Sequence, residues 1–346
     1  MPTGYVKEVF EATGGPGNES TAATPSTKVL YTPALQVDSK PNAKFLERGD
    51  ELRGSDESPP PLIPEKFEPT WEVLSRAYPD LLGFRLKHIL GEPTTTAGNG
   101  IITDPDAVVI PAGAYRHVWT SPFGPSGAFP ITTEMIAAFK DQSVFTKLRG
   151  AACAELELEF PDDGGVQVKA SGPGTYWSRI SDPSLTPAPE TITTKPFMRG
   201  GLSIPTVLAS GGTIADFGLK IENPVETPFL VGVASKFPST AEKDNEGPII
   251  VSGTIPKRQL DQDDIDALMA GTGFALIAKL ISDTIIASAY KHTLWVSIDN
   301  AQYSEGGPDT LENKRRHGMD LSWKASYDGA GASATLTLVN ATASYA

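Results

Sequence analysis

Three carboxylates occupy alternate positions of one short stretch, at Glu155, Glu157 and Glu159. Apolar residues fill the positions between them, which is the period-two pattern of a strand with one buried face and one polar face. Like charges about 7 Å apart on such a strand repel by roughly half a kcal/mol per pair in water. The pattern fits an ordinary solvated sheet face. It also fits a surface that must be acidic, such as a channel wall along which another polyanion slides.

Other residues with chemical potential do not form a recognisable catalytic or metal-binding motif. The run from Asp261 to Asp266 begins like a calcium loop, but it lacks the glycine and the closing glutamate, and a helix N-terminus explains its charge. Cys153 is the only cysteine, so we expect a structural role for it. None of the histidines has metal-ligand spacing to another histidine or to the cysteine; they are His88, His117, His292 and His317. We therefore expect no enzyme activity, no cofactor and no bound metal.

The composition points to a turn-rich β protein. The chain has 346 residues, of which 33 are glycine, 30 are proline and 39% are hydrophobic. A net charge of −13 argues against tight binding to nucleic acid, because phosphates are held by clustered lysine and arginine. The longest apolar region, from Phe274 to Ala289, is interrupted by Lys279 and Asp283, so no membrane span is expected.

Local patterns predict the elements that would position these residues. Alternation predicts a β-hairpin from Ala154 to Ala170 and a second one from Leu321 to Leu338. Helices are expected between Thr70 and Pro79 and from Asp261 to Ala270. Residues 131–147 fit either a helix or a strand, and Met135, Ile136 and Phe139 favour the helix. Further strands are expected at Val29–Tyr31, Leu35–Asp38, Gly83–Leu90, Ala107–Ile110 and Tyr115–Thr120.

Several patterns recur in the same order in the second half of the chain. Leu35–Asp38 returns as Leu219–Glu222 at an offset of 184, and Ala114–His117 is echoed by Ala289–His292. A short helix and a hairpin also recur, which predicts an internal duplication. The predicted organisation is an extended N-terminal arm over residues 1–28, a first domain over 29–180, a proline-rich linker over 181–196 and a second domain over 197–346.

The order of these elements resembles the tail tube (major tail) proteins of long-tailed bacteriophages. The similar features in the second half are Ile221–Pro224, the strand at Gly253–Ile255 and the closing Leu336–Asn340. The resemblance covers most of residues 30–346 and rests on pattern and order. It implies a mainly β protein with two duplicated β-sandwich or barrel-like domains, each flanked by a short α-helix.

The resemblance also implies a structural virion protein of the tail, assembled in the host cytoplasm. Its rings would stack into a tube around a tape-measure protein, and the tube would later be the conduit for DNA ejection, without specific DNA binding. A two-domain member resembles the versions that close as trimeric rings with pseudo-sixfold symmetry.

Two site hypotheses follow. The first places Glu155, Glu157 and Glu159 on the lumen; Ser322, Lys324 and Ser326 of the second hairpin do not repeat these glutamates, so the lumen would carry alternating charge. The second assigns contacts between rings to the two long charged loops, Glu47–Pro69 and Ser235–Pro248. The charged residues involved would be Glu47, Arg48, Asp50, Glu51, Arg53, Lys243 and Asp244.

The alternative function from another class is a β-sandwich that binds carbohydrate, either a binding module or an adhesin. Trp119, Trp177 or Trp295 would then be exposed platforms on which a sugar ring stacks.

Overall fold

A computed structural model provides the fold. It describes residues 8–13, 29–46, 63–121, 131–139, 144–161, 164–180, 192, 194–206, 216–229, 235–243, 247–257, 262–308, 319–326 and 333–345. Within these ranges the chain is mainly β, as predicted, and no sheet closes into a barrel.

A five-stranded antiparallel sheet is built from the first half of the chain. Its order is β2-β1-β9-β10-β13. The strands are β1 (Glu8–Thr13), β2 (Val29–Thr32), β9 (Thr132–Phe139), β10 (Val144–Ala152) and β13 (Tyr176–Ile180).

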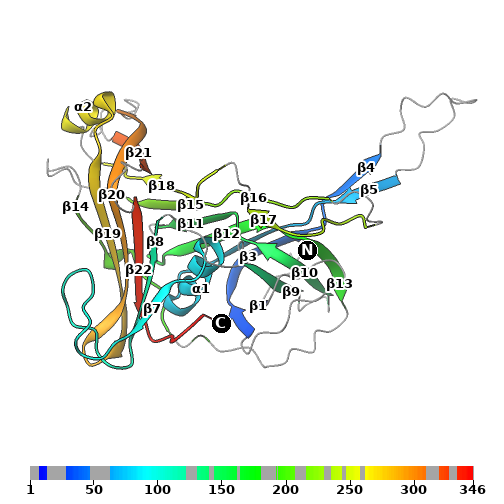
Figure 1. Cartoon of the computed structure of the whole chain (residues 1–346), viewed down its shortest axis with the longest axis horizontal. Coiled ribbons are helices and arrows are strands. Elements are labelled where there is room, and N and C mark those ends of the chain that lie inside the picture. The colour runs from blue at the N-terminus through cyan, green and yellow to red at the C-terminus, as the bar shows by residue number, and fades with distance from the viewer. Residues whose placement is uncertain are drawn as a thin grey trace, which may run out of the picture.

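A thirteen-stranded sheet runs through both halves of the chain (Figure 1). Its main path is β3-β6-β12-β11-β15-β18-β21-β20-β22-β8-β7, and β19 pairs with both β20 and β14. The strands from the first half are β3 (Ala34–Lys40), β6 (Thr70–Arg76), β7 (Thr94–Ala97), β8 (Tyr115–Thr120), β11 (Glu155–Glu159) and β12 (Gln167–Pro173). Those from the second half are β14 (Leu202–Thr206), β15 (Gly218–Glu222), β18 (Ile250–Thr254), β19 (Phe274–Ala287), β20 (Tyr290–Pro308), β21 (Met319–Ala325) and β22 (Ala334–Asn340).

Two small hairpins and three helical segments complete the described elements. The hairpins pair β4 (Ala43–Leu46) with β5 (Ile63–Phe67), and β16 (Val225–Glu226) with β17 (Glu242–Lys243). The β4–β5 hairpin projects away from the body of the molecule (Figure 1). The helices are α1 (Pro79–Leu90), α2 (Gln262–Ala270) and the short 3-10 helix η2 (Arg199–Gly201).

Helix α1 lies where the sequence predicts a strand. Pro79 begins this helix and does not end an earlier one, which fits the preference of proline for the first helical turn. From Leu81 to Leu90 every residue is buried, including Arg85, Lys87 and His88. A helix that is covered on all sides shows no amphipathic period, and this is why the pattern at Gly83–Leu90 was misleading.

Four other predictions about elements are wrong. The expected helix at Thr70–Pro79 is strand β6, in which Trp71 and Val73 are buried on alternate positions, and part of residues 131–147 forms strand β9. Residues 107–110 form no strand; Val109 makes only an isolated bridge to Thr103. The second hairpin is also absent, because β21 and β22 do not pair. They lie end to end along one edge of β20, and the alternation within a strand does not specify its partner.

The remaining element predictions are confirmed. Helix α2 covers the stretch predicted from Asp261 to Ala270, and β8 begins at Tyr115 as expected. The first hairpin exists as β11 and β12, with Glu157 opposite Lys169. Leu156 and Leu158 of β11 are buried, as the period-two pattern requires.

The two halves have the same strand order. In the first half β3-β6-β12-β11 form consecutive neighbours, and in the second half β15-β18-β21-β20 do so. The order β1-β9-β10-β13 is matched in the same way by β14-β19-β20-β22. Each half has a helix after the second strand of its first matched set: α1 follows β6, and α2 follows β18. Each half also has a small hairpin before that strand, β4–β5 before β6 and β16–β17 before β18. The excursion over residues 92–121, which contains β7 and β8, occurs in the first half only.

Candidate functional site

The eight consecutive strands β3-β6-β12-β11-β15-β18-β21-β20 carry the candidate site. One face of this run is packed into the core, through residues such as Val73, Leu156, Ile221 and Trp323. The opposite face, which we call the polar face, displays charged and amide side chains. Residues that are opposite each other in an antiparallel pair point to the same face, so the pairing register defines its rows. The central row contains Gln36, Leu74, Lys169, Glu157, Lys220, Ser252, Lys324 and Gln302.

The three glutamates predicted from the sequence lie together on the polar face. Glu155, Glu157 and Glu159 are half-buried, while the leucines between them point into the core. β11 lies in the middle of the run, between β12 and β15, so the carboxylates are flanked by neighbours on both sides.

Lysines from neighbouring strands balance part of this charge. Lys220 Nζ lies 3.1 Å from a carboxylate oxygen of Glu155 and 2.8 Å from one of Glu222, and Lys169 Nζ lies 3.3 Å from Glu72. All of these side chains are about a third or more exposed, so each pair contributes little to stability. The polar face therefore carries alternating charge.

The carboxylate of Glu157 has a shifted pKa. Burial raises its pKa above the ordinary value for glutamate, and the neighbouring charges of Glu159 and Glu155 raise it further. The pKa of Lys220 is also raised, mainly by its hydrogen bond to Glu222. Glu157 therefore takes up a proton at a higher pH than an ordinary glutamate does.

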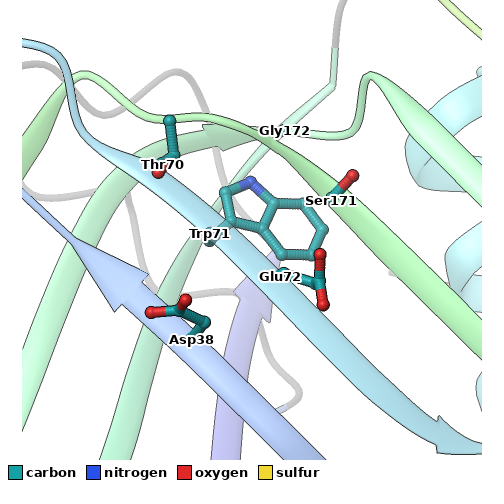
Figure 2. A pocket seen from close by; sticks show the side chains of 6 residues that line it. All are labelled: Asp38, Thr70, Trp71, Glu72, Ser171 and Gly172. Atoms are coloured by element: carbon teal, nitrogen blue, oxygen red, sulfur yellow. The ribbon is translucent and has the colours of Figure 1, made fainter. Parts of the chain in front are cut away.

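A shallow hollow of about 320 Å³ opens on the polar face near β3 (Figure 2). It is lined by Asp38, Thr70, Trp71, Glu72, Ser171 and Gly172. The indole of Trp71 is only 2% exposed, stacks on His88 and donates its N–H to the carbonyl of Ala152 at 3.0 Å. Two carboxylates, from Asp38 and Glu72, thus face solvent over a buried ring.

The second half contributes residues to the polar face that sequence reasoning missed. Lys324 faces Ser252 as Lys169 faces Leu74, so the two lysines occupy matching positions. Gln302, opposite Lys324, therefore matches Glu157, and the counterparts of Glu155 and Glu159 are Asn300 and Glu305. The sequence comparison made β21 the equivalent of β11 in the second half. The strand order of the fold shows that the equivalent of β11 is the C-terminal part of β20. The lysine that β12 and β21 share, at Lys169 and Lys324, was the signal that could have found this match.

Most of the charged loop residues predicted for contacts between rings lie outside the described residues. These are Glu47, Arg48, Asp50, Glu51, Arg53 and Asp244; Lys243 is described and belongs to β17. The bases of the two loops contact each other. The rings of Phe67 and Phe237 stack with their centroids 4.9 Å apart, and the N–H of Phe67 donates to the carbonyl of Lys236 at 2.7 Å.

Two of the three tryptophans considered for a carbohydrate site do not offer the platforms that it needs. Trp119 and Trp295 are 2% and 1% exposed, so a sugar ring cannot stack on either face. Trp177 is half-buried and donates its indole N–H to the hydroxyl of Ser39 at 3.2 Å.

Comparison with known proteins gives one family. The sequence model of the family described as phage tail tube protein matches residues 4–331. The chain therefore belongs to the phage tail tube protein family. No curated protein matches the sequence.

Family membership makes this a structural protein of the phage tail that self-assembles into a tube. The family is a structural one and not a family of enzymes. Among the helices that the structure describes, none is both long and apolar enough to cross a membrane.

Proposed function

We propose that this chain polymerises as stacked rings whose lumen is the conduit for DNA ejection. The observation that carries the proposal is the eight-stranded run, in which four strands of each half form one sheet with a continuous polar face. Such a sheet supplies a curved wall when copies are set side by side, because sheets twist and coil. Rings of this kind would be assembled in the host cytoplasm before they enter the virion tail.

Three chains per ring is the proposed stoichiometry. Each chain carries the same strand order twice, so three chains present six equivalent four-stranded segments. The matched order also supports an internal duplication, with proposed domains at 29–180 and 197–346 and a proposed linker at 181–196. Within the predicted arm at 1–28, however, Glu8–Thr13 is strand β1, which belongs to the matched order of the first half. Head-to-tail contacts between unlike edges close into a ring only when the rotation per chain fits a whole number of copies.

The polar face is the proposed wall of the lumen. Glu155, Glu157 and Glu159, interleaved with Lys169 and Lys220, would give a wall that neither binds nor strongly repels a passing polyanion. A tape-measure protein would occupy the lumen first, and DNA would pass through later without specific binding. The two charged loops, at Glu47–Pro69 and Ser235–Pro248, would make contacts between rings, since their bases lie side by side.

Electron microscopy of the purified chain tests the assembly. At high protein concentration we expect rings and stacked tubes, and analytical ultracentrifugation should give a ring mass of three chains. A protein that stays monomeric at every concentration would overturn the proposal.

A helical reconstruction of the tubes tests the lumen assignment. We expect density for β11 on the inner wall, with the three glutamates toward the axis. Density for β11 on the outer surface would refute this assignment and leave the tube itself intact.

A further inference from the structure

The two matched helices differ in how far they are covered. Every residue of α1 from Leu81 to Leu90 is buried. Among the residues of α2, only Asp264 and Ala267 are buried, and Met269 is 82% exposed. Each helix lies against the matched strand of its own half, α1 against β11 and α2 against β20. The difference therefore comes from what lies on the other side of each helix.

The second half of the chain covers the other side of α1. At the start of the helix, the carbonyl of Pro79 accepts a hydrogen bond from the side-chain amide of Asn340, the last residue of β22, at 3.1 Å. Tyr345, in the segment after β22, also packs on the helix. Near the end of the helix, the side-chain amide of Asn223 donates to the carbonyl of Ile89 at 3.3 Å. Helix α1 thus fills the seam between the two halves (Figure 1).

The duplicated strand order indicates what would cover α2. Strand β13 in the first half is the counterpart of β22 in the second half. Since α1 of a first half meets β22 of a second half, α2 of a second half would meet β13 of a first half. Within one chain, α2 and β13 lie on opposite sides of the molecule (Figure 1). The β13 that would meet α2 is therefore that of another copy.

The side chains of these two surfaces are complementary. Ile265 and Met269 lie one turn apart on α2 and form an apolar stripe, in which Ile265 is half-buried. Asp266 beside this stripe is exposed, and α2 has no basic residue in its last turn. At the end of β13, Ile180 is half-buried and Arg179 is exposed. Contact between the two surfaces would bury apolar side chains and bring opposite charges together.

We infer that α2 of one copy packs against the end of β13 in the next copy, as α1 packs against the end of β22 within one chain. This inference rests on the proposed function and adds a helix contact between neighbouring copies of a ring. The two surfaces differ, so the contact is head-to-tail and every copy offers one of each. In the ring both helices are then covered, although in a single chain only α1 is.

An exchange of charges tests the contact. Arg179→Glu should raise the protein concentration needed for tube assembly about tenfold, because the new carboxylate would face that of Asp266. Asp266→Lys should have the same effect. The double variant R179E/D266K restores opposite charges between copies and should assemble like the wild type. The melting temperature of the unassembled variants should match that of the wild type, because both side chains are exposed in a single chain.

The matched control is Lys291→Glu, which makes the same change of charge at the far end of the β19–β20 pair, opposite Ile285. Combined with Asp266→Lys, this change should not restore the assembly that Asp266→Lys weakens. Equal recovery with Lys291→Glu and with Arg179→Glu would mean that net charge controls assembly, and it would overturn the inference.

Carbodiimide cross-linking provides a second readout. Arg179→Lys keeps the positive charge and supplies an amine that can form an amide with the carboxylate of Asp266, while the carbodiimide takes up the water as a urea. In tubes we expect covalent dimers whose linked peptides contain positions 179 and 266, and in unassembled protein we expect none. Tubes without these linked peptides, or without rescue by the charge exchange, would show that the contact is wrong while the proposed function stands. If the wild type never self-associates, both are wrong.

Discussion

Lys257 and Asp264 form an ion pair in the interior of the molecule. Their side chains are 1% and 0% exposed, and the second carboxylate oxygen of Asp264 accepts a hydrogen bond from the hydroxyl of Tyr303 at 3.0 Å. The carboxylate therefore has partners on both oxygens. Asp264 belongs to the acidic run that resembles a calcium loop in sequence, and in the fold it ties α2 to the sheet.

Removing one partner of this pair should be costly. We expect Asp264→Ala to lower the free energy of unfolding by about 3–5 kcal/mol, because Lys257 is left buried without its counter-charge. The measurement is urea unfolding at neutral pH. The double variant Lys257→Met with Asp264→Leu should recover most of the loss. Lys291→Ala, which breaks an exposed pair with Asp283, should change stability by less than about 1 kcal/mol.

His88 makes the stability of the fold depend on pH. Its ring is buried, and Nε2 donates to the carbonyl of Ala151 at 3.0 Å. Burial, helped by the charge of Arg85, lowers its pKa from 6.5 to about 3. As pH falls below 6.5 the unfolded chain therefore takes up this proton first, and the folded state loses stability until about pH 3.

The expected contribution of His88 is about 1.4 kcal/mol per pH unit within that window. Urea unfolding of the wild type and of His88→Gln between pH 7 and pH 4 measures it as a difference in slope. The glutamine variant should show the flatter dependence on pH. Equal slopes would mean that His88 is protonated in the folded state as well.

For single residues, the sequence predicted which side chains share a face of a strand. It did not predict which side chains of neighbouring strands they contact. The alternation around Glu157 fixes its orientation through local geometry alone. Its neighbours Lys169 and Lys220 come from strands whose register depends on distant packing, which no local pattern encodes.

Helix α1 depends on a close approach of the chain's last described residues. A side chain added at Gly83 would put its Cβ 2.0 Å from the ring of Tyr345, which is 6% exposed. Lys87, one turn further along the helix, also contacts the carbonyl of Tyr345. The segment after β22 therefore packs on the helix of the other half.

This contact should reverse the usual effect of a helix substitution. Glycine to alanine inside a helix normally stabilises by about 1 kcal/mol, but the clash with Tyr345 costs about 1–3 kcal/mol. We expect Gly83→Ala to destabilise the wild type. In a Tyr345→Ala background, which itself costs about 3–5 kcal/mol, the same change should stabilise. A double-mutant cycle by urea unfolding checks the sign; stabilisation in both backgrounds would contradict the contact.

Some elements with one buried face were predicted correctly, whereas helix α1, which is covered on all sides, was not. Strand β11 and helix α2 show their periods clearly, and both were predicted. In β6 the spacing of Trp71 and Leu74 imitates a helix, although Trp71 and Val73 are the residues in the core. The pairing of β20 with both β21 and β22 depends on the length of β20, which the sequence pattern did not reveal.

The two halves are interlocked across the whole molecule. β8 of the first half pairs with β22 of the second, and β11 pairs with β15. We therefore expect one unfolding transition, with fluorescence and far-UV circular dichroism giving the same midpoint in urea. Leu158→Ala, at the β11–β15 junction, should lower both midpoints equally. Two separated transitions would show that the halves unfold independently.

The order of repeated patterns led to the duplication hypothesis, which the matched strand orders support. The predicted matches were partly wrong, since an excursion in the first half shifts every later offset. The pattern arguments alone did not indicate a function, whereas the family resemblance did. The match to the phage tail tube protein family over residues 4–331 confirms that resemblance.

The excursion over residues 92–121 has a consequence for anything that docks on the assembled tube. It belongs to one half only, and its strand β8 is fixed against the other half. Each chain therefore displays it once, although the strand order occurs twice. A partner that recognises this excursion would have one binding site per chain. The spacing of the bound partner on the tube would therefore follow the number of chains and not the number of repeated strand sets.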